Sequence, residues 1–93
     1  MTFEWDIKKE QINLMKHGLD FSTSALVFGD ENRIELYDYL HSTSEDRYIT
    51  IGTIYDITIV VAVVYTERNN TIRIISSRRA TKNEKEAYYE ERY

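Results

Sequence analysis

The sequence predicts a small α+β fold with two N-terminal helices, an antiparallel sheet of about four strands and a C-terminal helix. Three observations support this prediction. Apolar residues recur at helical spacing before residue 30, they alternate with polar residues from Arg33 onward, and a helix-capping sequence follows the last alternating segment. A length of 93 residues suits one domain, which is expected to span 1–93.

The first helix is predicted to begin after Asp6, whose carboxylate can accept hydrogen bonds from the free amides of the first turn. It ends at Lys16-His17-Gly18, where cations and a left-handed glycine suit the carboxyl end of a helix. The aromatic segment 3–5 precedes it as an optional first strand, and a shorter second helix is expected between Asp20 and Gly29. The apolar positions of the first helix are Ile7, Ile12, Leu14 and Met15.

Four segments after the helices have the pattern of strands. The first has Ile34 and Leu36 between charged residues, and the third is apolar on both faces, as in a strand that is covered on each side. Asn69-Asn70 tolerates the positive φ of a tight turn, so the fourth segment is expected to return antiparallel to the third. The segments are 33–37, 47–54, 57–65 and 71–77, with a polar loop at 38–46.

The charges are unevenly distributed along the chain, although the formal net charge is only −4. Residues 1–46 hold four basic and ten acidic residues, whereas 47–93 hold eight basic and six acidic ones. Guanidinium groups bind phosphate oxygens in pairs and stay charged at any working pH, so an acid-free cationic stretch predicts a site for an anionic partner. The alternative is that these arginines pair with acids of the N-terminal half. The stretch contains Arg68, Arg73, Arg78, Arg79 and Lys82.

Thr81 and Glu84 have the spacing of a capping box, which predicts a final helix that runs towards Tyr93. Arg78 and Arg79 come directly before its N-terminus, where free amides also favour an anion, so a phosphate is expected here. Tyr88 on this helix either stacks on bases or packs the helix against the sheet.

Several classes of protein are excluded by what the sequence lacks. Without cysteine there is no disulfide, thiolate zinc site or cysteine nucleophile. It has no glycine-rich phosphate loop, nucleophile elbow or metal-ligand spacing, so we expect neither a cofactor nor a metal. The apolar stretch 57–65 is too short to span a membrane, and the N-terminus has no signal-peptide pattern, which predicts a cytoplasmic location.

His17 and His41 are the side chains whose unperturbed pKa lies near neutrality, so they are the natural candidates for general acid and base. His17 lies at a helix end, where binding to the terminal carbonyls is the alternative role. His41 lies in the polar loop, close in sequence to Asp38, Glu45 and Asp46, and a carboxylate can orient it there. The alternative for His41 is a solvated loop side chain.

Short motifs follow one another along nearly the whole chain. In the first half they are Phe3-Glu4-Trp5-Asp6, Asn13, Lys16-His17-Gly18, Ala25 and Val27-Phe28. In the second half they are Arg47, Ile51-Gly52, 64–68, 72–76, 78–81 and 84–88. In this order the motifs resemble the BrnT family of bacterial toxins.

The resemblance implies a fold similar to the RelE group and a type II toxin, an endoribonuclease that inhibits translation. It further implies a BrnA-type antitoxin as partner. This antitoxin carries a ribbon-helix-helix domain that binds operator DNA, so the toxin reaches the DNA only indirectly. The residues that match the family pattern are Lys16, His17, His41, Arg47, Arg68, Arg73, Arg78 and Glu84.

Metal-independent cleavage of RNA uses the 2′-hydroxyl of the substrate as nucleophile, so the protein must align the RNA, stabilise charge at phosphorus and move protons. We expect Arg73 and Arg78 to stabilise the phosphorane, and His41 is the first candidate for the base. The competing interpretation is a noncatalytic module whose arginines bind an acidic protein segment. Glu84 is a further catalytic candidate, and the expected RNA contacts are Lys16, His17, Arg47, Arg68, Arg79 and Tyr88.

Overall fold

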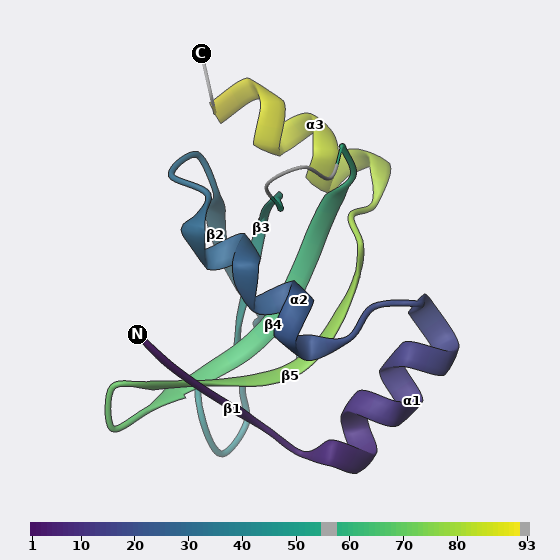
Figure 1. Ribbon diagram of the computed structural model, residues 1–93. Coiled ribbons are helices and arrows are strands. Elements are labelled where there is room, and N and C mark those ends of the chain that lie inside the picture. Colours follow the sequence, from purple (N-terminus) through teal and green to yellow (C-terminus); the bar gives the residue numbers. More distant parts are fainter. Residues whose placement is uncertain (55–57, 92–93) are drawn as a thin grey trace.

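The computed structural model describes residues 1–54 and 58–91, which form one mixed sheet flanked by helices (Figure 1). The strand order is β1-β5-β4-β3-β2, and the predicted α+β class is confirmed. No helix among these residues combines the length and apolar composition needed to cross a membrane. The elements in chain order are β1 (Thr2–Trp5), α1 (Ile7–His17), α2 (Phe21–Ser24), the 3-10 helix η1 (Ala25–Gly29), β2 (Ile34–Tyr37), β3 (Tyr48–Thr53), β4 (Val60–Arg68), β5 (Thr71–Arg79) and α3 (Lys82–Glu91).

Strands β2 to β5 form the antiparallel meander that the sequence predicts. Asn69 and Asn70 make the tight turn between β4 and β5, with φ of 52° and 65°. The strand predicted at 57–65 is observed from Val60 to Arg68, and its predicted first residue, Ile57, lies outside the described residues.

The sheet differs from the four antiparallel strands predicted, because β1 adds a fifth strand that runs parallel to β5. Phe3 lies opposite Ile72 and Trp5 opposite Ile74, and both aromatic side chains pack against the core. The segment is only four residues long and its partner strand is the last one in the chain, so its pairing depends on tertiary contacts rather than on a local signal.

Three of the helix ends that the sequence predicts are held by the expected local hydrogen bonds. Asp6 accepts from the amides of Lys8 and Lys9, and Gly18 ends α1 with φ of 70°. Thr81 and Glu84 exchange the two bonds of a capping box at the start of α3; the predicted end at Tyr93 lies beyond the described part of the chain. The second helix is shorter than expected, one α-turn continued by η1, and its N-cap residue makes no side-chain capping bond.

The first helix turns its polar side towards the protein. Its one buried residue is Asn13, which donates to Leu19 O at 2.9 Å and to Ser77 Oγ at 3.1 Å and accepts from Ser77 N at 3.0 Å. Ser24 donates to the same Ser77 hydroxyl at 2.7 Å. A buried polar network therefore fastens α1 to β5, while the predicted apolar positions of the helix face the solvent.

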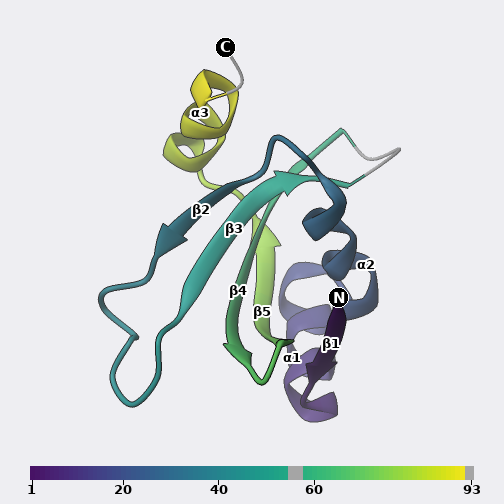
Figure 2. The ribbon, with the colours of Figure 1, turned by 90° about the vertical axis from the view of Figure 1, so that its left-hand side faces the viewer.

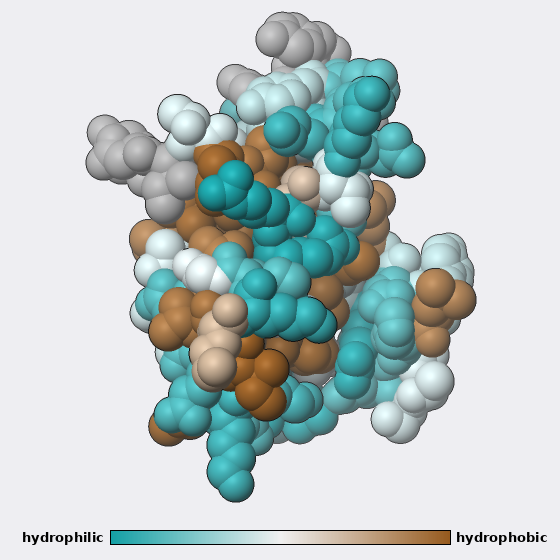
Figure 3. Space-filling model, turned by 90° about the vertical axis from the view of Figure 1, so that its right-hand side faces the viewer, coloured by the Kyte–Doolittle hydropathy of each residue, from teal (hydrophilic) through white to brown (hydrophobic). Residues whose placement is uncertain are grey.

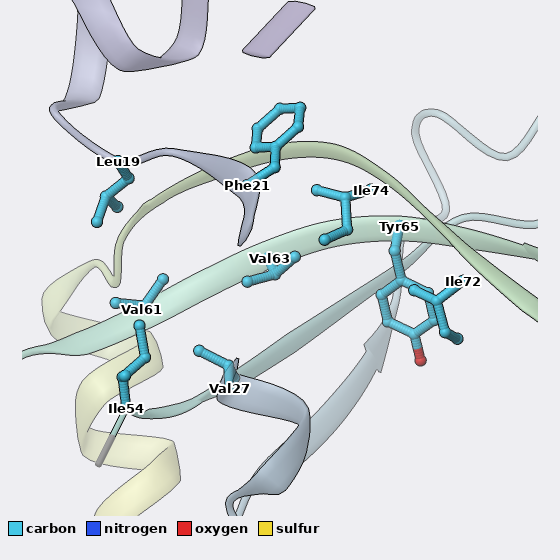
Figure 4. Packing of buried hydrophobic residues seen from close by; sticks show 9 residues of the cluster. All are labelled: Leu19, Phe21, Val27, Ile54, Val61, Val63, Tyr65, Ile72 and Ile74. Carbon is cyan, nitrogen blue, oxygen red and sulfur yellow. The ribbon is translucent and has the colours of Figure 1, made fainter. Parts of the chain in front are cut away.

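The main core lies between the sheet and the segment that contains α2 and η1. We call this side of the sheet the covered face. Phe21 and Val27 from the helical layer pack there with Val63 of β4 and Ile74 of β5, as Figure 4 shows. All four of these side chains are at most 1% exposed, so this layer fixes where the sheet lies.

The opposite side of the sheet, which we call the open face, is covered by the described part of the chain only at one end. There Tyr88 of α3 packs on Ile51, Val60 and Ala62, and Figure 2 shows α3 beyond one end of the sheet, away from α1 and α2. The middle of the open face carries one row of partly exposed or exposed side chains across four strands, namely Leu36, Ile49, Val64 and Ser76.

A β-bulge changes which side chains of β5 reach the open face. Ser76 pairs with Val64 but Ile74 pairs with Tyr65, so Ile75 has no partner in the register. The extra residue shifts the alternation by one position. Arg73 and Arg78 are an odd number of residues apart and would point to opposite faces of a regular strand, yet the bulge brings both to the open face.

Gly52 is expected to be required for packing, because a Cβ atom there would lie 2.8 Å from Asp30 Oδ2 and 3.0 Å from Arg33 Cβ. The Asp30 carboxylate cannot easily retreat, since it accepts a hydrogen bond from the Tyr88 hydroxyl at 2.6 Å. We expect Gly52→Ala to lower the free energy of unfolding by about 2 kcal/mol in urea denaturation. Gly29→Ala, where a Cβ meets nothing within 4 Å, is the matched control. Equal stability of the two variants would contradict this account.

Candidate functional site

Four of the arginines that the structure describes lie on the open face, and one of them, Arg68 of β4, shares the alternation of Thr66. Arg73 and Arg78 come from β5, and Arg47, one residue before β3, shares the alternation of Ile49. Arg73 pairs with Thr66, and Thr66 follows the β4 residue opposite Tyr48, so Arg47, Thr66 and Arg73 form a row across the sheet. With strands about 4.8 Å apart, the backbones of Arg47 and Arg73 are about 10 Å apart.

The two arginines of this row differ in their acidic neighbours. Arg73 Nη1 lies 3.4 Å from Glu4 Oε2 of β1, in a pair that is open to solvent. Arg47 forms no ion pair with any residue in 1–54 or 58–91. Because an exposed ion pair is weak, both guanidinium groups can bind an incoming anion at this end of the open face.

Arg78 is held by a bidentate ion pair at the other end of the open face. Its Nη1 and Nη2 donate to the two carboxylate oxygens of Glu84 at 2.7 and 3.0 Å, and the Thr81 amide donates to the same carboxylate at 2.8 Å. The bonds from Arg78 lower the pKa of Glu84 against the opposing effect of burial. The Glu84 carboxylate thus occupies the helix N-terminus at which the sequence predicted a phosphate.

Arg68 is paired with Glu45, through bonds of 2.8 and 2.7 Å from Nε and Nη2. This pair and the contact of Arg73 with Glu4 match the alternative in which the arginines pair with acids of the N-terminal half. Arg79 carries no such pair within the described residues, and its partner in the register is Val61, whose side chain is buried on the covered face. Arg79 therefore points away from the open face.

Two further predicted residues lie beside the bulge. A groove between α1 and β5 is lined by Lys16 and His17, together with Ile75 and Ser76 of the stretch between Arg73 and Arg78. Lys9 lines the same groove and was not predicted from the sequence. Its spacing of seven residues from Lys16 was the available signal, because residues seven apart lie on one side of a helix.

His41 is placed at the Arg47 end of the sheet, in the loop that joins β2 and β3. Its Nδ1 lies 3.0 Å from Asp38 Oδ2, and the ring is 64% exposed. The loop closes on Arg47, whose carbonyl accepts from the Asp38 amide at 2.9 Å and whose amide donates to Ser42 Oγ at 2.9 Å. The structure thus brings His41 towards Arg47 and separates it from Arg78.

Tyr88 packs in the manner that the sequence left open as the alternative to base stacking. The side chain is 1% exposed, and its hydroxyl binds the carboxylate of Asp30. Burial raises the pKa of Asp30, but hydrogen bonds from Tyr88 and from the amides of Thr53 and Asn32 outweigh it, so the pKa is lowered. Tyr88 therefore fastens α3 to the loop after η1 and presents no ring to a base.

Comparison with known families decides the identity. A family model described as "Ribonuclease toxin, BrnT, of type II toxin-antitoxin system" matches residues 5–84. The chain belongs to the BrnT family. Every arginine of the open face and all of the groove lie within the matched part of this BrnT chain. No curated protein gives a match to the sequence.

The BrnT family is one of ribonuclease toxins, and a type II system pairs each toxin with an antitoxin. The match ends at Glu84, so it includes the Arg78 ion pair and leaves out most of α3. Within the described residues of this BrnT chain, no three acidic or histidine side chains are gathered in a way that could hold a metal ion.

The Arg78–Glu84 ion pair is expected to make the stability of this BrnT chain depend on pH. The pKa of Glu84 is lower in the folded chain than its ordinary value of 4.5. The ionised Glu84 carboxylate therefore contributes its full stabilisation above about pH 4.5, and this contribution is lost as the pH falls through the pKa of Glu84 in the folded chain. Urea denaturation should show Glu84→Gln to be less stable than wild type at pH 7, and the difference should shrink as the pH falls below 4.5. Glu86→Gln, on the same helix, is the control, and a difference that does not shrink at acid pH would contradict the assignment.

Proposed function

We propose that the chain is a metal-independent endoribonuclease that binds RNA on the open face and inhibits translation by cutting it. The observation that carries the proposal is the bulge at Ile75, which turns Arg73 and Arg78 to the same uncovered side of the sheet as Arg47. Guanidinium groups aligned on one surface suit the phosphates of a single strand. In this proposal residues 1–93 act as one toxin domain. The protein acts in the cytoplasm, because its substrate is RNA that is being translated there.

The spacing of the arginines favours contacts with different phosphates. Arg73 and Arg78 are five residues apart on β5, which corresponds to about 16 Å between their backbones. At this separation the two guanidinium groups are not expected to bind the same phosphate. We therefore assign Arg73, with Arg47, to the reacting phosphate. Arg78 then binds a neighbouring phosphate, and Glu84 holds its guanidinium in place until the RNA arrives.

The proposed reaction needs only the protein, the substrate and water. A base takes the proton of the 2′-hydroxyl, and the oxygen attacks the adjacent phosphorus. The bond to the 5′-oxygen breaks, and this oxygen takes up a proton from water, which gives a 2′,3′-cyclic phosphate and a 5′-hydroxyl. Arg47 and Arg73 stabilise the charge that develops on the phosphoryl oxygens. His41 is our candidate for the base, because Asp38 on Nδ1 leaves Nε2 to accept the proton.

The test is incubation of the purified, antitoxin-free chain with mixed-sequence RNA at low salt in excess EDTA. We expect cleavage, and we expect it to stop where the scissile nucleotide carries a 2′-deoxy substitution. His41→Ala in the same assay at pH 7 should lose activity. Unchanged cleavage by His41→Ala would remove the histidine from the mechanism, while absence of cleavage by wild type would overturn activity on free RNA.

A BrnA-type antitoxin with a ribbon-helix-helix domain is the partner that we propose, and operator DNA would be reached through it alone. The noncatalytic alternative, an antitoxin-binding subunit or co-repressor, shares this partner and the same arginines. It is favoured by one observation, namely that Arg68, Arg73 and Arg78 each already pair with a carboxylate. The deoxy substitution separates the two, because binding without chemistry does not depend on the 2′-hydroxyl.

A further inference from the structure

The outer side of α1 carries a strip of exposed apolar side chains, which we call the α1 strip: Ile7, Ile12, Leu14 and Met15. Their exposed fractions are 66%, 64%, 49% and 89%. At about 100° per residue, measured in one direction around the helix axis from Asn13 on the inner side, Leu14, Ile7, Met15 and Ile12 lie at about 100°, 120°, 200° and 260° and so span the outer side of the helix. Figure 3, viewed from the side of the molecule on which α1 lies, shows hydrophobic surface among hydrophilic side chains.

The charges around the α1 strip are of one sign. Lys8, Lys9 and Lys16 are exposed, whereas the acid within the helix, Glu10, is half-buried and accepts a hydrogen bond from the Phe21 amide at 2.9 Å. The Asp6 carboxylate is likewise engaged by the first-turn amides. A second copy of this chain would bring lysines against lysines, so the charge favours an acidic partner.

The α1 strip is continuous with the candidate RNA site. Ile12 and Lys16 belong to the strip and its border, and both also line the groove beside Ile75 and Ser76. These two β5 residues lie between Arg73 and Arg78 in the sequence. A partner that is seated on the strip and extends into the groove would therefore stand in the path of RNA on the open face.

We propose that the α1 strip binds an acidic amphipathic helix of the antitoxin, an inference that rests on the toxin function proposed above. The helix α1 has 11 residues and is about 16 Å long, which a partner helix of about three turns matches. Such a helix would place apolar anchors at i, i+3 or i+4 and i+7 on the strip and carboxylates beside the lysines.

The test is calorimetric titration with the antitoxin encoded by the reading frame next to the gene for this chain. Ile7→Asp/Met15→Asp should weaken binding at least 30-fold, because it puts two carboxylates on the strip. Leu26→Asp/Leu40→Asp is the matched control, since both leucines are more than half exposed elsewhere, at 59% and 86%. The control should bind within threefold of wild type, and thermal melts should show both variants folded.

The outcomes separate this inference from the function on which it rests. Wild-type affinity of the Ile7→Asp/Met15→Asp variant would overturn the proposed surface and leave the antitoxin pairing intact. Failure of the wild-type chain to bind would overturn the pairing itself. If light scattering showed that the wild-type chain is a dimer and that this variant is a monomer, the strip would be assigned to a second copy of the chain. We expect the Ile7→Asp/Met15→Asp variant to cut RNA as wild type does and to resist inhibition by the antitoxin.

Discussion

Replacing both Arg73 and Arg78 by alanine is expected to reduce RNA cleavage in EDTA by about 10³-fold or more. One guanidinium stabilises the reacting phosphate and the other aligns its neighbour, and removal of a single such group typically costs 10²-fold to 10³-fold. Both side chains are partly exposed, so the fold should survive the change. The measurement is the initial rate of cleavage under single-turnover conditions.

The matched control for this experiment removes the same charge elsewhere. Lys8→Ala/Arg79→Ala takes two cations from the outer side of α1 and from the side of β5 opposite the open face. We expect it to cut RNA within about threefold of wild type, allowing for the general attraction of cations to RNA. Equal losses in the two double variants would show that overall charge, and not placement on the open face, determines activity.

Asn13→Ala is expected to cause the largest loss of stability. The change leaves the Ser77 amide and the Leu19 carbonyl without their buried partners. Each unsatisfied group costs about 1–3 kcal/mol, so we expect a loss of about 3 kcal/mol. In a domain of this size, that corresponds to a fall in Tm of about 12 to 24 °C.

Gln11→Ala provides the control for Asn13→Ala. Gln11 lies two residues away on the same helix, is exposed and makes no side-chain hydrogen bond within the described residues. Gln11→Ala should therefore leave the Tm within about 2 °C of wild type, since surface substitutions usually change stability by less than 0.5 kcal/mol. If Asn13→Ala melted as this control does, α1 would be held mainly by contacts other than the polar network.

The parts of the fold that depend on local signals could be predicted from the sequence. Asp6, Gly18 and the Asn69-Asn70 turn each act on the few residues around them, so their roles follow from residue type and spacing. The parallel pairing of β1 and the inward turn of Asn13 could not be predicted, because both depend on β5, at the other end of the chain. The short α2 followed by η1 shows the same limit, since its burial against the sheet outweighs helical periodicity.

The candidate site divides in the same way. Alternation along β5 correctly separates Arg73 from Ile72 and Ile74, but it cannot reveal the bulge that brings Arg78 to the same face. Nor can it show that Glu84 turns back onto Arg78. The residue type of Tyr88 allows either base stacking or packing against the sheet, and only the packing of α3 on Ala62 and its neighbours decides for burial.

The pairing of β1 with β5 has a consequence for how the protein folds during its synthesis on the ribosome. Residues 2–5 leave the exit tunnel before their hydrogen-bonding partners at 71–74, because each partner lies 69 residues further along the chain (for example, 71 − 2 = 69). At about 5–20 residues per second, the N-terminal segment waits roughly 3 to 14 s without its partner strand. Asn13 likewise waits for Ser77. A nascent chain of this protein therefore cannot hold the arginines of β5 in their final places until residues 71–79 have left the exit tunnel.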